Sequence, residues 1–158
     1  PSGVTFFYLT DLDNSHYDNC MRTNQWLEEK FEIMLADNFA DMDIKNPIFI
    51  KFGRKSKRRL GSIALREVRG EQDKMSIIVL NGYFRSEEVP EEVILVTIAH
   101  ELVHYLHGFN SYHEQAHDFP HKGSVVNKEL RRRGFSNQLQ FQRQWLKINW
   151  KNIIVNNY

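Results

Sequence analysis

The sequence predicts a single α+β domain over residues 1–158, and three observations carry this prediction. Apolar residues recur at helical spacing in one early segment. Short runs rich in β-branched residues follow, and helical spacing then returns for the second half of the chain. Because the strand and helix patterns are grouped and do not alternate, they favour an α+β fold with segregated elements. The length and the 41% hydrophobic content are typical of one globular domain.

The first element is a helix over residues 23–39. Residues 1–18 mix Asp and aromatic residues without a clear period, and only a short strand at 6–9 is expected there. Thr23 can then cap a helix whose apolar positions share one face. These positions are Trp26, Leu27, Phe31, Met34, Leu35 and Phe39.

Three strands are expected next, at residues 48–52, 60–68 and 75–80. A basic segment separates the first two and has the composition of an exposed turn. The third run, M-S-I-I-V-L, ends at Asn81-Gly82. Together they predict a small, mostly antiparallel sheet.

The second half is predicted to be helical apart from one loop. Pro90 begins a helix that ends before Gly108, and four glutamates around its first turn complement the helix dipole. The His-rich residues 109–121 form a loop, and a further helix runs from about 122–124 to Gly134. Ser136 can cap a last helix over about 136–153.

A metal-binding pattern lies in the Pro90 helix. Six of the seven histidines fall between residues 100 and 121, and residues 100–104 are H-E-L-V-H. Positions i and i+4 share a helix face, so His100 and His104 can reach one metal ion, with Glu101 beside them as general base for a metal-activated water. Zinc suits imidazole ligands, and Cys20, the only cysteine, excludes a thiolate-rich site.

A catalytic zinc takes a third protein ligand, and the residue pattern leaves several candidates open. The H-E-x-x-H-x-x-G-x-x-H spacing is absent, and His107 lies one turn too far along the helix to complete the site. His121 follows Pro120, which would fix its orientation. His113 and His117, four residues apart, could instead form a solvated pair, substrate contacts or a second weak metal site. The remaining candidates are Glu114, Asp118 and Glu129.

Residues 23–135 resemble the SprT-like metallopeptidase domain, the zincin domain of Spartan-type proteases. The motifs that carry the resemblance are R-L-G-S-I-A at 59–64, S-I-I-V-L-N at 76–81, the H-E-L-V-H helix, and the segment 117–135, which ends in R-R-R-G-F. The resemblance implies a zincin-like sheet packed against the H-E-L-V-H helix and flanking helices. In that family the third ligand is a His that begins H-G-x-x-F/W. The matching stretch here is H-K-G-S-V, with the Gly displaced by one position and Val replacing the aromatic residue, and it favours His121 over His117.

These observations predict a zinc-dependent endopeptidase whose metal is held by His100, His104 and His121. Glu101 would act as general base and then as proton shuttle to the leaving amine. One alternative is a DNA-binding or scaffolding protein with a structural or vestigial zinc site, although such a site would not require Glu101. Another is a zinc hydrolase acting on a non-peptide amide.

Charge is distributed unevenly along the chain. Residues 1–46 contain three Lys or Arg against nine Asp or Glu, whereas 51–69 contain eight basic residues and only Glu67 as an acid. The run from Lys51 to Arg69 and the cluster Arg131–Arg133 predict sequence-independent DNA binding; solvated surface is the alternative. Eukaryotic members of the family cleave proteins crosslinked to DNA, and the resemblance thus implies DNA-associated proteins as substrates. These members use extra DNA-binding modules, often a Cys-rich zinc ribbon, which a chain with one cysteine does not carry.

No apolar run approaches the length of a transmembrane helix, so no membrane partner is expected. The start P-S-G-V has no signal-peptide character, and the single cysteine fits a reducing compartment. The expected location is therefore intracellular, in the cytoplasm or at the nucleoid or nucleus. Because the sequence does not begin with Met, we expect a processed form or part of a longer protein.

Overall fold

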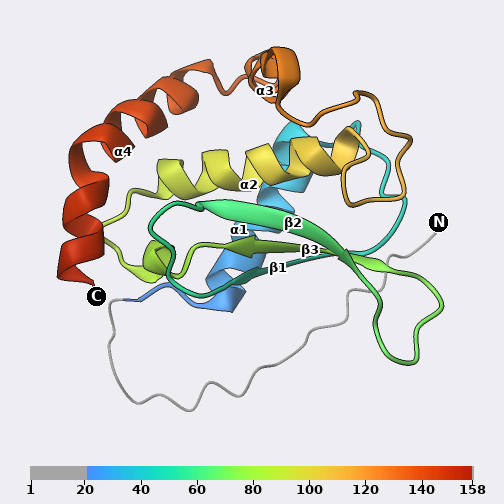
Figure 1. Cartoon of the computed structure of the whole chain (residues 1–158), viewed down its shortest axis with the longest axis horizontal. Helices are drawn as coiled ribbons and strands as arrows, with labels where there is room; N and C mark the ends of the chain where they lie inside the picture. The colour runs from blue at the N-terminus through green and yellow to red at the C-terminus, as the bar shows by residue number, and fades with distance from the viewer. Residues whose placement is uncertain (1–20, 158) are drawn as a thin grey trace.

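The structure is a computed structural model that describes residues 21–157, and it has the α+β architecture expected from the sequence (Figure 1). The predicted strand at 6–9 lies outside the described residues. The elements follow in the order α1 (Asn24–Asn38), β1 (Ile48–Phe52), β2 (Gly61–Arg66), β3 (Met75–Leu80), the 3-10 turn η1 (Gly82–Arg85), α2 (Glu91–Leu106), the 3-10 turn η2 (Lys122–Ser124), α3 (Val125–Arg132) and α4 (Ser136–Asn156).

The sheet is mixed, and the prediction of a mostly antiparallel sheet is wrong. Its strand order is β1-β3-β2, with β3 parallel to β1 and antiparallel to β2. The reason lies at Asn81, directly after β3. Its side-chain oxygen accepts from Ser56 N, and its amide nitrogen donates to the carbonyls of Ser56 and Arg59. These bonds draw the β1–β2 loop across the end of β3, so β1 and β2 lie on either side of β3 and do not form a hairpin.

α2 is the central element of the core. α1 packs against β1, and α2 packs against β2 and β3. α3 and α4 pack on α2 (Figure 1). Five α2 residues have no exposed surface: Val93, Ile94, Ile98, Ala99 and Leu102. Gln142 of α4 donates to Val93 O and to Thr97 Oγ1, which fixes α4 along α2. The helix that carries the histidines is therefore held from several sides.

Most predicted helix ends agree with the structure. Thr23 Oγ1 accepts a hydrogen bond from Trp26 N at 3.1 Å, as expected for the cap of α1. The predicted cap at Ser136 is wrong, because Phe135 occupies the cap position and Ser136 is the first residue of α4. α4 also continues beyond 153 to Asn156, since Ile153 is buried and anchors the last turn. None of the described helices has the length and apolar character needed to cross a bilayer.

A buried polar network joins α2 to the segment before β1 and to the loop after α2. The Tyr105 hydroxyl donates to Asn46 O and accepts from the backbone N–H groups of Lys45 and Asn46. The Asn46 side chain donates to Ser76 Oγ and accepts from Tyr112 N. These bonds fix the start of the 109–121 loop, and they use the hydrogen-bonding capacity of the Tyr105 hydroxyl.

Tyr105→Phe is expected to lower the free energy of unfolding by about 1–3 kcal/mol, because the buried N–H of Asn46 and the part-buried N–H of Lys45 lose their acceptor. Tyr112→Phe is the matched control. Its hydroxyl accepts one bond from Lys74 N on the surface, so its loss is expected to cost less than about 1 kcal/mol. Urea unfolding of both variants measures the difference. Equal losses would show that the Tyr105 network does not stabilise the fold.

Candidate metal centre

Three histidines converge beside the middle of α2. His100 and His104 lie one turn apart on α2, and their Nε2 atoms are 3.1 Å apart. The His121 ring comes from the end of the 109–121 loop, with its centroid 4.7 Å from that of His104 and 5.5 Å from that of His100. One nitrogen from each ring lies within 4.8 Å of the other two, which is close enough to hold one metal ion. Among residues 21–157, no other group of three His, Cys, Asp or Glu side chains meets this criterion.

The backbone after His121 explains how a distant residue reaches α2. Gly123 has φ +70° and Ser124 has φ +57°, both left-handed, so the chain turns sharply between His121 and α3. α3 then buries Val126 and Leu130 against α2. A glycine suits position 123 because it adopts this φ without strain. The displaced Gly of the H-K-G-S-V stretch is therefore the residue that this turn requires.

The environment of the cluster keeps the imidazoles of His100 and His104 neutral. Burial, together with the neighbouring His121, lowers the pKa of His100 to about 4. Burial and the other histidines lower the pKa of His104 to about 3. Neutral imidazoles carry the free lone pair that a metal requires. The rings of His100 and His104 therefore fit a divalent cation.

Glu101 lies next to this cluster and is only 5% exposed. Burial raises the pKa of its carboxyl to about 7, against a smaller lowering by the charge of Arg59. Its Oε1 atom lies over Gly61 of β2, where an added Cβ would be 2.8 Å from Oε1 and 2.9 Å from Thr97 Cγ2. The absence of a side chain at Gly61 therefore makes the space that the carboxyl group occupies. The sequence motif R-L-G-S contained this signal, but the role of its glycine is visible only in the structure.

The other candidates for a third ligand lie outside the cluster. His113 Nε2 lies 2.7 Å from Asp43 O, and its ring packs on Tyr105. The rings of His107 and His117 pack on each other. Glu129 is bound by Arg132 and Arg133, while Glu114 and Asp118 are exposed outside the cluster. His121 is thus the residue that the structure brings to His100 and His104.

The two predicted basic clusters have different surroundings. Arg133 is 5% exposed and pairs with Glu129 and Asp41, so it is part of the fold and does not form a free cationic surface with Arg131 and Arg132. The run from Lys51 to Arg69 is divided by β2. Its larger part, 54–59, lies in the β1–β2 loop. Arg66 is the last residue of β2 and Arg69 follows it, so both lie at the opposite end of this strand, roughly 17 Å away at the rise of an extended strand.

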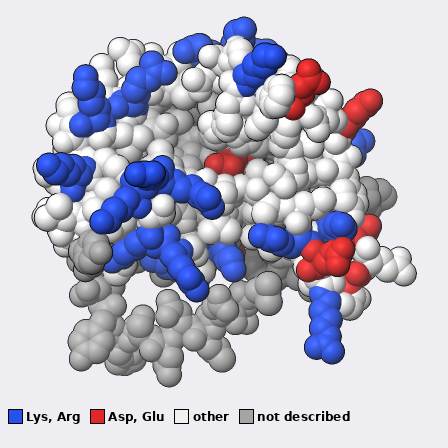
Figure 2. Space-filling view, in the orientation of Figure 1, with Lys and Arg blue, Asp and Glu red and all other residues white. Residues whose placement is uncertain are grey.

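The β1–β2 loop borders a cavity of about 340 Å³ that extends to Gly61, and thus towards Glu101. Its charged lining residues are Arg54, Lys55, Arg58 and Arg59. Trp150 of α4 donates to Lys57 O, which places α4 beside this loop. Figure 2 shows Lys and Arg side chains gathered on this side of the molecule. Lys147 and Lys151 are exposed on α4, three residues before and one residue after Trp150.

Comparisons of the chain with protein-family models, with curated proteins and with solved structures find no match. The site geometry is therefore the basis on which its function is argued.

Proposed function

We propose that this protein is a zinc-dependent endopeptidase whose metal is held by His100, His104 and His121. The observation that carries the proposal is the cluster of three imidazole nitrogens within 4.8 Å of one another, with the buried Glu101 directly after His100 on the same helix. Three protein ligands with an open position are typical of catalytic zinc sites. A purely structural zinc site is usually closed by four protein ligands, and the described residues bring only these three together.

The chain's own residues would supply the proton transfers. Zinc, when bound, would supply Lewis acidity towards water and the scissile carbonyl. The Glu101 carboxylate would take a proton from the attacking water as the new C–O bond forms. The same carboxyl group would then give this proton to the leaving amine as the C–N bond breaks. Burial suits this role, because a carboxyl group with a raised pKa can both accept and return a proton near neutral pH.

The proposal is tested by incubating the zinc-loaded chain with unfolded protein and with a panel of small non-peptide amides. Endopeptidase activity predicts internal cleavage of the polypeptide that depends on both zinc and Glu101. Turnover of the small amides alone would favour the alternative of a zinc hydrolase that acts on non-peptide amides.

Gly61→Ala is expected to lower kcat by about 10–100-fold with little loss of zinc, because the new methyl group displaces the Glu101 carboxyl from its place. Ser62→Ala is the matched control, since alternate residues of a strand point to opposite faces. Steady-state kinetics and zinc analysis of the two variants measure the effect. An unchanged kcat in Gly61→Ala would show that the close approach of β2 to Glu101 is not needed for catalysis.

A second proposed property is sequence-independent DNA binding through the β1–β2 loop. It is favoured by the basic cavity beside Gly61 and by the exposed lysines of α4 on either side of Trp150. If DNA binds there without any zinc- and Glu101-dependent hydrolysis, a DNA-binding or scaffolding protein with a structural metal becomes the better description.

The double variant Arg54→Gln/Arg58→Gln is expected to weaken DNA binding. The slope of log K against log salt concentration is expected to fall in magnitude by about one for each phosphate that the protein no longer neutralises. The control removes the same charge at the other end of β2, as Arg66→Gln with Arg69→Gln. Fluorescence anisotropy with a short duplex over a range of salt concentrations measures both pairs. Equal affinities for the two pairs would remove the β1–β2 loop as the binding surface.

A further inference from the structure

A second pair of histidines lies at the end of α2, outside the three-histidine cluster. The ring centroids of His107 and His117 are 4.8 Å apart, and the ring planes are inclined at 80°. His100 and His104 have nearly the same relation, at 4.7 Å and 81°, and so do His104 and His121, at 4.7 Å and 89°. The second pair therefore repeats the ring arrangement of the histidines that can share a metal ion.

His107 has an unsatisfied polar atom in this position. It is 8% exposed, and its Nδ1 atom is buried without a hydrogen-bond partner. A buried polar atom without a partner costs free energy unless something else satisfies the group. Burial lowers the pKa of His107, and its neighbours His117 and Arg133 lower it further, against the opposing charge of Glu129. The imidazole is therefore a neutral donor that can bind a metal ion.

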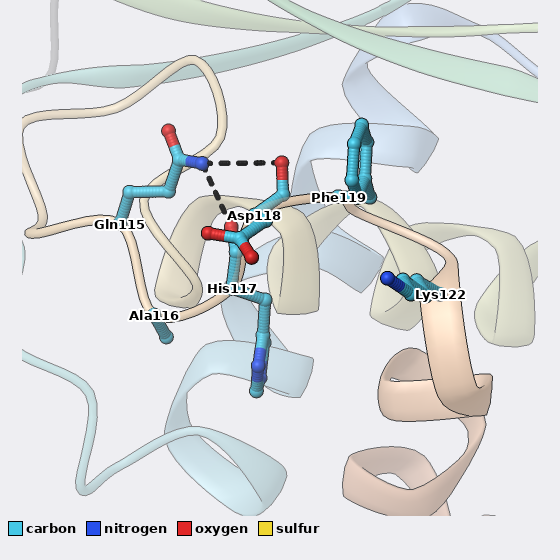
Figure 3. Close-up of a pocket in the computed structure, with 6 residues that line it drawn as sticks. All are labelled: Gln115, Ala116, His117, Asp118, Phe119 and Lys122. Atoms are coloured by element: carbon cyan, nitrogen blue, oxygen red, sulfur yellow. Dashed lines mark hydrogen bonds between the residues drawn. The ribbon is translucent and has the colours of Figure 1, made fainter.

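The loop that carries His117 is already fixed against the end of α2. Ala116 N donates to His107 O at 3.0 Å, and an added Cβ at Gly108 would lie 2.6 Å from Glu114 O. The Gln115 side chain donates to the carbonyl of His117 at 2.7 Å and braces the loop (Figure 3). The approach of His117 to His107 is thus set by backbone contacts as well as by the two rings.

Solvent can reach this pair from the His117 side. His117 lines an open cavity of about 420 Å³ together with Asp118, Phe119 and Lys122 (Figure 3). Water can therefore reach the His117 ring and supply further ligands to a metal ion held there. Two histidines with water ligands suit zinc, nickel or copper, and they bind more weakly than a site with three histidines.

We propose that His107 and His117 form a second, weaker site for a transition-metal ion. A metal ion bound there links the C-terminal end of α2 to the 109–121 loop. Because His121 follows His117 by only four residues, this link also restrains the segment that carries the third histidine of the first cluster. The second site needs neither Glu101 nor hydrolytic activity, so it is independent of the proposed function.

The test is a calorimetric titration with Zn²⁺ of the full chain, after the tighter site has been loaded with zinc and free zinc has been removed. The wild type is expected to bind about one further ion per chain, and His117→Ala is expected to lose this binding. His113→Ala is the matched control, because His113 lies in the same loop but contacts Asp43 and Tyr105. His117 is a half-buried loop residue, so its replacement leaves the core intact.

The outcomes separate the second site from the first. Loss of the weak binding in His117→Ala but not in His113→Ala supports the second site, and slower amide exchange in the 109–121 loop of the wild type at high zinc would support the link to α2. Equal weak binding in the wild type and His117→Ala overturns the proposal, as does its absence from the wild type. The titration is repeated in His121→Ala, in which the first site is impaired. The second pair does not include His121, so this variant is still expected to bind one weakly held zinc ion.

Discussion

Glu101→Gln is expected to lower kcat for peptide hydrolysis by at least about 10²–10⁴-fold while the chain keeps its zinc. Glutamine has nearly the shape of glutamate and fits the space over Gly61, so the fold and the three histidines are retained. Its neutral amide cannot accept a proton from water. The loss therefore reports the missing general base and not a collapsed site.

The matched control is Glu114→Gln, which removes the same charge from an exposed loop position outside the three-histidine cluster. Its kcat is expected to equal that of the wild type. Peptide hydrolysis and zinc content are measured on the same preparations of all three proteins. A Glu101→Gln variant that hydrolyses peptides at the wild-type rate with zinc bound would remove Glu101 from the mechanism.

His121→Ala is expected to weaken zinc binding at the first site by more than about 100-fold. Loss of a residue that only orients a ligand weakens metal binding by up to about 100-fold, and loss of the ligand itself is expected to cost more. Only two imidazoles remain in this variant, whereas catalytic zinc takes three protein ligands. Peptide hydrolysis is expected to fall with the zinc occupancy. His121 is exposed, so its replacement tests the metal site without disturbing the core. His104 is buried, and its replacement would disturb the core.

Competition with a chromophoric chelator measures the zinc affinity of His121→Ala beside His113→Ala. The His113 variant is expected to bind zinc at the first site as the wild type does. Unchanged tight binding in His121→Ala would mean that another residue supplies the third ligand, and the assignment of His121 would then be wrong.

The part of the site on α2 could be predicted from the sequence because helical geometry is local. His100 and His104 meet wherever residues 100–104 form a helix, whatever else the chain does. His121 lies 17 residues after His104, and its position depends on the left-handed turn at Gly123 and on the packing of α3. The residue pattern leaves it one candidate among several, and the family resemblance favours it over His117.

Non-local partners account for the features that the sequence did not predict. The strand order depends on the side chain of Asn81, which holds a loop more than twenty residues earlier. Arg133 belongs to a basic cluster in the sequence, but in the fold it pairs with Asp41, 92 residues away. The same holds for the contact between His107 and His117, since no helical or strand period relates residues ten positions apart across a loop.

The most direct test of the central claim is the zinc content of the wild-type chain, purified without added metal and measured by elemental mass spectrometry. The three-histidine site predicts about one tightly held zinc ion per chain after dialysis removes weakly bound metal. A chain that contains no zinc after purification and takes up none on reconstitution would contradict the metal centre, and with it the proposed hydrolysis.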